Sequence, residues 1–253
     1  MNIYKIPVVS NEKIEARTYL LKAYSPEIAD NILPGQFCNI KVSDSDFPLL
    51  RRPFSICDVD DEHIFFMFDI HGEGTRLLAE KTNSDFIDVL SPLGNGFGLE
   101  DDYDKAILIA GGIGSAPFPY VTRFLKNKKE VVTFIGGRSK ENIITHGMAN
   151  IEIATDDGSV GFHGNVVELF KSKLDKFSND RIKVFGCGPN PMLRALKELC
   201  LAENIHAEIS VECAMACGFG ICQGCPVENT DEHEKYSLVC KDGPVFNVKD
   251  VII

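Results

Sequence analysis

The 253-residue sequence has no long hydrophobic run and no basic patch. No window approaches the ~18 consecutive apolar residues of a membrane span, and the first residues lack the apolar core of a signal peptide. Acidic residues outnumber basic ones by 37 to 26, and the resulting net charge of −11 argues against nucleic acid or an anionic membrane as a partner. We therefore expect a cytoplasmic protein that binds neither nucleic acid nor membrane.

The length and composition predict more than one packed unit. The chain exceeds the usual size of one domain, and hydrophobic residues make up 44% of it, so two domains and a small module are expected. Thiols stay reduced in the cytoplasm, so the nine cysteines indicate metal ligands and small buried residues rather than disulfides. Cys38, Cys57 and Cys200 lie in apolar patterns, and we expect them in the core.

Five cysteines gather near the end of the chain, and four of them have a spacing typical of iron–sulfur proteins. Cys217, Cys222 and Cys225 are spaced C-x4-C-x2-C, and Cys240 follows after fourteen residues. The opening spacing is the plant-type pattern of a [2Fe-2S] cluster. A structural zinc ion also takes four cysteines, but zinc ligands usually come as two short pairs of comparable spacing, so the pattern favours iron–sulfur.

The residues between these cysteines also bear on the site. Gly218, Gly220 and Gly224 let the loop bend and let backbone N–H groups approach the sulfurs. Cys213 precedes Cys217 by four residues, so on a helical turn it would point the same way and compete as a ligand. We expect Cys213 to be a free thiol, because its use would break the C-x4-C-x2-C unit.

Residues 1 to about 100 show short β-type runs separated by turns, which predicts an antiparallel barrel or sandwich. Within one extended segment, Arg52, Phe54 and Ser55 offer a charge, a ring and a polar edge to a flat ligand that carries phosphate. A strand that simply buries Phe54 explains the same residues. The expected strands are residues 4–9, 16–23, 36–42, 54–58, 64–69 and 86–90.

A glycine-rich turn follows the expected strand at 64–69. Gly74 and Thr75 would present backbone N–H groups at the start of a helix that begins at Leu77, where a phosphate binds favourably. A turn whose only role is to cap the helix explains the same residues equally well. Because both segments belong to one barrel, together they favour a flavin dinucleotide.

From residue 105 the chain alternates apolar runs with helical stretches, which predicts a parallel sheet covered by helices on both faces. For the last helix, Asn190 is the candidate N-cap and Pro191 the first helical residue. The expected strands are residues 106–110, 131–135, 151–155 and 182–185, and the expected helices are residues 113–126, 166–174 and 192–202.

Three segments that follow strands in this region are rich in small or polar residues: 111–117, 155–161 and 185–190. Each one alone is an ordinary strand-to-helix turn, and the first does not match G-x-G-x-x-G. Ligands of parallel sheets bind at the carboxyl ends of the strands, so three such turns at one edge favour a dinucleotide cleft.

Four segments, in this order, resemble the ferredoxin–NADP reductase superfamily: residues 52–55, 74–75, 111–117 and 186–189. The cysteine spacing, joined to the sequence V-C-K-D-G-P-V-F at residues 239–246, narrows the resemblance to the electron-transfer subunits of NAD-dependent class 1B dihydroorotate dehydrogenase. It covers essentially the whole chain. It implies an antiparallel FAD-binding barrel at residues 1–100, a parallel-sheet NAD-binding α/β domain at 101–210 and a small [2Fe-2S] module at 211–253.

The resemblance also implies three sets of site residues, and it puts Cys187 near the nicotinamide. For FAD they are Arg52, Pro53, Phe54, Ser55, Met67, Phe68, Asp69, Gly74 and Thr75. For NAD they are Gly111, Gly112, Gly114, Asp156, Cys187, Gly188 and Pro189. For the cluster they are Cys217, Cys222, Cys225 and Cys240.

The choice of NAD over NADP depends on charge. Arg138 and Lys140 could meet a 2′-phosphate, but they equally suit a solvated turn, whereas Asp156 and Asp157 would repel that phosphate. With the resemblance, this favours NAD. We assign no catalytic side chain, because hydride transfer requires the protein to position two rings and exclude water rather than to supply an acid and a base.

The implied partner is a separate FMN-containing catalytic subunit that oxidises dihydroorotate to orotate in pyrimidine biosynthesis, in a heterotetramer with two copies of each subunit. One alternative keeps the cofactors but makes the chain a reductase component for another partner, such as a ferredoxin or a hydrogenase. A second alternative is a zinc-bearing adaptor without enzymatic activity.

Overall fold

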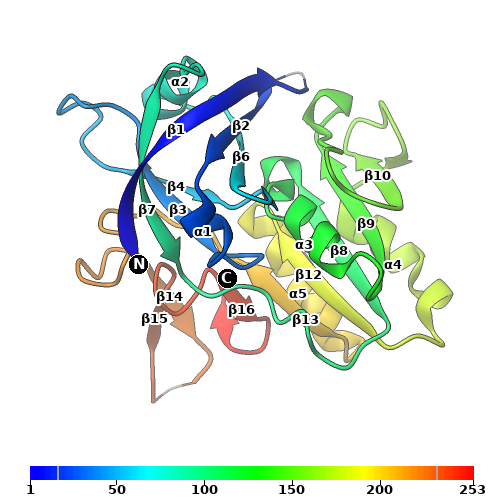
Figure 1. Ribbon diagram of the computed structural model, residues 1–253. Helices are drawn as coiled ribbons and strands as arrows, with labels where there is room; N and C mark the ends of the chain where they lie inside the picture. Colours follow the sequence, from blue (N-terminus) through cyan, green and yellow to red (C-terminus); the bar gives the residue numbers. More distant parts are fainter. Residues whose placement is uncertain (16, 232) are drawn as a thin grey trace.

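The computed structural model describes residues 1–15, 17–231 and 233–253, and three sheets organise them (Figure 1). Two sheets have seven strands each, and the third, near the C-terminus, has three. None of the described helices is long and apolar enough to cross a membrane.

The first sheet is antiparallel and curls into a half-barrel, with the strand order β4-β3-β7-β1-β2-β6-β5. Its two ends approach each other, since the ring of Phe54 on β4 lies 5.7 Å from that of Phe68 on β6. The barrel predicted from the spacing of short strands is therefore confirmed. Its strands are β1 (Asn2–Lys13), β2 (Thr18–Tyr24), β3 (Phe37–Lys41), β4 (Arg52–Ser55), β5 (Asp58–Asp60), β6 (His63–Asp69) and β7 (Phe86–Leu93).

The half-barrel differs from the sequence-based expectation in one strand and in its two helices. The single strand expected at 54–58 is two strands, because the chain leaves β4 at one edge and joins β5 at the other. The first residue of the strand expected at 16–23 lies outside the described residues. A short helix, α1 (Pro26–Ala29), follows β2, and the helix expected from Leu77 is α2 (Glu73–Ala79).

α2 begins four residues earlier than expected because a side chain fixes its first turn. The Thr75 hydroxyl accepts hydrogen bonds from the N–H groups of His71 and Gly72 and donates one to the Gly72 carbonyl. Gly74 and Thr75 thus still lie in the first turn of a helix.

The second sheet has the order β11-β10-β9-β8-β12-β13-β16 and is parallel except for β16, as the alternating pattern predicted. Helices cover both faces. The strands are β8 (Lys105–Gly111), β9 (Glu130–Gly137), β10 (Ile151–Thr155), β11 (Phe162–His163), β12 (Ile182–Cys187), β13 (His206–Ser210) and β16 (Val245–Asn247). The helices are η1 (Gly112–Ser115), α3 (Phe118–Leu125), η2 (Lys140–Asn142), α4 (Val166–Ser172), η3 (Leu174–Phe177) and α5 (Asn190–Ala202).

Alternation along the strands fixes which helix covers which face. On β8, Ile107 and Ile109 pack with α4 and α5, while Ala106 and Leu108 pack with α3 on the other side. Cys38, Cys57 and Cys200 are fully buried, as predicted.

Proline positions explain two corrections in these helices. The helix expected at 113–126 is a 3-10 turn followed by α3, because Pro117 separates the two at the α3 N-cap. In α5 the N-cap is Pro189 in an extended conformation, and Asn190 is the first helical residue rather than the cap. Pro191 fits at the second position, where no intrahelical N–H bond is needed.

The C-terminal segment packs into both larger units. Its own sheet is β15-β14-β17, with β14 (Pro226–Asn229), β15 (Tyr236–Leu238) and β17 (Val251–Ile252), while β16 joins the second sheet. Cys225 and Cys240 share one hydrophobic core with Phe37 of the half-barrel and Leu193 of α5. The cysteine-rich end is thus held against both sheets.

Candidate functional site: a cavity beside a cysteine loop

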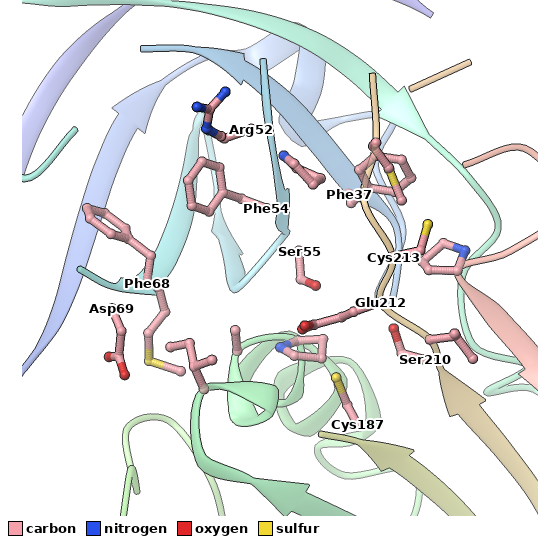
Figure 2. A pocket seen from close by; sticks show the side chains of 18 of the residues that line it. Phe37, Arg52, Phe54, Ser55, Phe68, Asp69, Cys187, Ser210, Glu212 and Cys213 are labelled. Atoms are coloured by element: carbon pink, nitrogen blue, oxygen red, sulfur yellow. The ribbon is translucent and has the colours of Figure 1, made fainter. Parts of the chain in front are cut away.

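A cavity of about 270 Å³ lies between the half-barrel, the second sheet and the segment that leads into the cysteine loop (Figure 2). Side chains from β3, β4 and β6 form one side, and the ends of β12 and β13 form the other. Eight of the nine residues predicted for FAD line it: Arg52, Pro53, Phe54, Ser55, Met67, Phe68, Asp69 and Thr75.

The ninth, Gly74, lies directly behind Arg52. A side-chain carbon on Gly74 would come 2.7 Å from Arg52 Nε, so only glycine lets the arginine rest against the first turn of α2. The arrangement brings a guanidinium group to the positive end of a helix. Both features attract an anion, and they come from segments that lie about twenty residues apart in the sequence.

The half-barrel side of the cavity is largely aromatic. Phe54 and Phe68 meet edge to face, and Tyr19 stacks on Phe68 with 5.8 Å between the ring centroids. Asp69 is fixed at the end of β6 by a 2.7 Å hydrogen bond from the Thr18 hydroxyl. The wall therefore presents flat apolar surface with a polar end.

The glycines predicted for NAD gather where β8 and β12 end. A side-chain carbon on Gly111 would lie 2.8 Å from both Met192 Sδ and Pro189 Cδ, and one on Gly114 would lie 2.5 Å from the Cys187 carbonyl oxygen. The two turns touch, so any side chain there would separate them. Gly188 is part of the same contact, since its own Cβ would lie 3.0 Å from Gly111 N.

Two other residues predicted for NAD lie apart from this contact. Gly112 has open space around it, and its φ of +54° is what requires glycine. Asp156 follows β10, which β9 separates from β8. Of the residues predicted for NAD, the described cavity includes only Cys187.

Sequence reasoning gave no role to Ser210 and Glu212, which close the cavity opposite Ser55. Figure 2 shows the Glu212 carboxylate pointing into the cavity, toward the side where Ser55 lies. Although the side chain is accessible from the cavity, the surrounding protein is close enough for burial to raise the pKa of Glu212, against an opposing effect of His71. The signal that could have found both is β13, which ends at Ser210 and was not predicted.

Cys187 is almost fully buried at the end of β12, beside these two residues. Burial raises the pKa of its thiol well above the usual range, the Glu212 carboxylate raises it further, and a hydrogen bond with Ser210 opposes the shift. The thiol therefore stays protonated, and it is a neutral, compact part of the cavity wall.

The four cysteines with the iron–sulfur spacing come together in one loop region. Cys225 Sγ and Cys240 Sγ are 3.1 Å apart, and the thiols of Cys217 and Cys222 are hydrogen-bonded. Backbone N–H groups also donate to these sulfurs: Gly220 to Cys240 at 3.1 Å, Cys222 to Cys217 at 3.4 Å and Cys240 to Cys225 at 3.5 Å.

These N–H groups do not affect all the loop thiols equally. Burial works to raise the pKa of Cys217, but hydrogen bonds from the backbone of Cys222, Phe219 and Ile221 prevail and lower it to about 6. A thiolate is the form that binds a metal. At Cys240 burial prevails instead and raises the pKa to about 12, although the Gly220 N–H opposes the shift. The backbone of the loop therefore favours the thiolate at Cys217.

The loop glycines differ in what they do. Gly218 and Gly220 have φ values of +80° and +89°, which favour glycine, as predicted for a loop that must bend. Gly224 does not adopt this conformation. Its neighbour Gln223, with φ of +57°, makes that turn instead.

Cys213 occupies the boundary between the two sites. It lines the cavity, and its thiol is hydrogen-bonded to that of Cys225. Phe37 also lines the cavity and packs in the same core as Cys225. The cavity and the cysteine loop therefore share a wall.

Comparison with known proteins gives consistent results for the sequence and the fold. Residues 212–252 match the model of the iron-sulfur cluster binding domain of dihydroorotate dehydrogenase B. The chain is 36% identical over 258 residues to the dihydroorotate dehydrogenase B (NAD(+)), electron transfer subunit, of Bacillus caldolyticus, with 98% of each chain covered. It is 34% identical over 254 residues to the subunit of the same name from Desulforamulus reducens, with 96% of each covered.

Among solved structures, the chain is similar to the NADH-dependent reduced ferredoxin-NADP oxidoreductase, a structure described for flavin-based electron bifurcation. The TM-score is 0.83 at 24% identity, with 98% of this chain and 90% of the other covered. The ferredoxin reductase of carbazole 1,9a-dioxygenase gives a TM-score of 0.66 at 22% identity, with 81% and 67% covered. At these identities the likeness shows the fold alone, which is that of the ferredoxin reductases.

Proposed function

The chain belongs to the family of electron transfer subunits of NAD-dependent dihydroorotate dehydrogenase B, and from this premise we propose that it carries electrons through a [2Fe-2S] cluster and FAD to NAD⁺. The observation that carries the proposal is the wall shared by the cavity and the cysteine loop. Cys213 and Phe37 line the cavity and also contact the core around Cys225, so two cofactors bound there would be neighbours.

The cavity fits the flavin end of FAD. Its half-barrel side offers the rings of Phe54 and Phe68 to a flat ring system, and Arg52 with Gly74 at the start of α2 offers positive charge to a pyrophosphate. Ser55 supplies a polar edge. A flavin supplies the exchange between the single electrons of an iron–sulfur cluster and the hydride pair that NAD⁺ accepts.

The cysteine loop fits two irons better than one zinc ion. A tetrahedral zinc with Zn–S bonds of about 2.3 Å would hold all four sulfurs within about 4 Å of one another. In the part of the chain that the structure describes, no three of the sulfurs gather within 4.8 Å; they stand as the pairs Cys217–Cys222 and Cys225–Cys240. Two pairs are what a cluster with two irons requires.

For NAD⁺ we propose the contact between the β8 and β12 turns. Gly111, Gly114 and Gly188 leave backbone exposed at the carboxyl ends of two neighbouring parallel strands, which is where such sheets bind nucleotides. Cys187 reaches from this contact into the cavity, which supports its position near the nicotinamide. Asp156 would meet the ribose and disfavour the 2′-phosphate of NADP.

We propose as partner an FMN-containing catalytic subunit that oxidises dihydroorotate, in an assembly with two copies of each subunit. The proposal is tested by mixing the purified chain with such a subunit, dihydroorotate and NAD⁺, and following NADH formation. NADH should form only when both proteins are present. A matched control replaces the chain with its Cys222→Ala variant, which should bind FAD but stop NADH formation.

The result that contradicts the proposal is a chain that contains cluster and FAD yet gives no NADH with the catalytic subunit. NADH oxidation with a ferredoxin or a hydrogenase in place of that subunit would then assign the chain to a different partner.

A further inference from the structure

Asn39 is a buried polar side chain whose amide group is not hydrogen-bonded to any described residue. It lies on β3 with 0% of its surface exposed, and within the described part of the chain neither its side-chain nitrogen nor its oxygen has a hydrogen-bond partner. An unpaired buried amide is costly, and native proteins rarely contain one without a reason. Its surroundings should therefore contain a partner that the polypeptide alone does not supply.

The direction of the side chain identifies where that partner lies. Along β3, Cys38 and Ile40 point into the core of the half-barrel, so Phe37 and Asn39 point to the other face. On that face Phe37 packs in the core that contains Cys225. Asn39 therefore faces the cysteine loop.

The closest contact is with the loop itself. A side-chain carbon on Gly218 would come 2.5 Å from Asn39 Nδ2, so the amide nitrogen lies against the residue that follows Cys217. Gly218 is thus required twice, by its φ of +80° and by the closeness of Asn39. Among the residues that the structure describes, no other side chain of the half-barrel comes this close to a glycine of the cysteine loop.

We propose that the Asn39 amide donates a hydrogen bond to a sulfur of the bound iron–sulfur cluster on the Cys217 side, and thereby raises the reduction potential of the cluster. This inference rests on the cluster of the proposed function. Sulfur accepts hydrogen bonds, and such bonds stabilise the reduced cluster, which carries one more negative charge. The other groups hydrogen-bonded to these sulfurs are backbone N–H groups of the loop and neighbouring cysteine thiols, whereas Asn39 belongs to the half-barrel.

Asn39 is therefore a positioning residue that ties the flavin-binding unit to the cluster. The hydrogen bond would fix the distance between the half-barrel and the loop at the point where the two proposed cofactors are neighbours. Leucine has nearly the same shape as asparagine but cannot donate, and aspartate has the same shape but presents only acceptors when ionised. These two substitutions separate the hydrogen bond from the packing.

The test is a redox titration of the anaerobically purified full chain, with the cluster signal followed by electron paramagnetic resonance. Asn39→Leu should shift the ratio of reduced to oxidised cluster about tenfold toward the oxidised form at a fixed potential, a fall of about 59 mV for one electron. Asn39→Asp should lower the potential further at high pH, where its buried carboxyl group is ionised, because a carboxylate adds negative charge beside the sulfurs. The matched control is Thr133→Val on β9. Like the Asn39 amide, the Thr133 hydroxyl is a fully buried and unpaired polar group, and its removal should leave the potential unchanged.

An Asn39→Leu variant with full iron content and the wild-type potential would overturn the inference. If that variant loses its iron, Asn39→Ala decides, because alanine is smaller and also cannot donate, and an unchanged potential in it would have the same meaning. A shift of equal size in Thr133→Val would also overturn the inference, because the effect would then come from general loosening. A wild-type chain without iron would instead contradict the proposed function.

Discussion

The cysteine loop and the cavity are built from the chain in opposite ways. All four proposed cluster ligands lie between Cys217 and Cys240, and the loop between them supplies its own N–H donors. The cavity draws on residues from Phe37 to Pro244 and on two sheets. A local site depends on spacing, whereas an assembled site depends on how the sheets pack.

One thiol of the loop, that of Cys217, differs from the thiols of the half-barrel core. Burial raises the pKa of Cys38 in the half-barrel core to about 12, against a weaker effect of a hydrogen bond with Ser91. In the loop, hydrogen bonds from the backbone overcome burial and lower the pKa of Cys217 to about 6. The surroundings thus keep the Cys38 thiol protonated in the core and favour the thiolate at Cys217, which is the form that binds a metal.

The largest expected effect comes from Cys222→Ala, which tests whether the two sites are separable. Loss of one ligand should reduce bound iron to less than about a tenth of the wild-type amount, because a cluster needs four thiolates. FAD should stay bound, since Cys222 does not line the cavity. Iron analysis and the flavin spectrum measure both.

The matched control for this variant is Cys200→Ala, which removes a fully buried thiol outside the loop and should retain both cofactors. Loss of FAD together with iron in Cys222→Ala would mean that the cavity cannot form without the cluster.

A smaller effect is expected from Arg52→Ala, which tests the cavity side of the comparison. A charge-assisted hydrogen bond contributes about 1.5–3 kcal/mol, so FAD should bind about 10–100-fold more weakly, with iron content unchanged. Fluorescence titration of the FAD-depleted chain measures the affinity. Arg76→Ala is the control, because Arg76 pairs with Glu73 on the exposed side of α2. Equal losses of FAD affinity in both variants would show that Arg52 does not bind FAD.

The smallest effect is expected from Glu212→Gln, through the pH dependence of stability. Burial raises the pKa of Glu212 in the folded chain, so its stabilising contribution is present below the unfolded pKa and is lost as the pH rises through the folded value. At pH 7 the variant should therefore melt about 1–2 °C higher than wild type, a small gain because the cavity admits solvent.

This difference should vanish near pH 3, where the carboxyl group is protonated in both the folded and unfolded chains. Thermal unfolding between pH 3 and pH 8 measures it, with Glu62→Gln as an exposed control. A difference that does not depend on pH would exclude titration of Glu212 as its cause.

The sequence predicted the fold class and the main strands because their signals are local. Short β-type runs separated by turns predicted the half-barrel, apolar runs alternating with helical stretches predicted the parallel sheet, and the cysteine spacing predicted the loop. The break at Pro117 is also a local signal, because proline does not continue a helix.

What the sequence could not predict depends on distant partners. β16 joins the second sheet beside β13, about forty residues earlier in the chain, and no local pattern records that pairing. Asn39 could not be recognised, because an asparagine in a strand gains meaning only from the loop that packs on it. The position of Glu212 in the cavity wall could not be predicted for a similar reason, since it depends on where β13 ends.

The most direct test of the account is the iron, sulfide and flavin content of the wild-type chain purified without oxygen. The account predicts about two irons, two sulfides and one FAD per chain. A folded chain that contains zinc in place of iron and no flavin would contradict it.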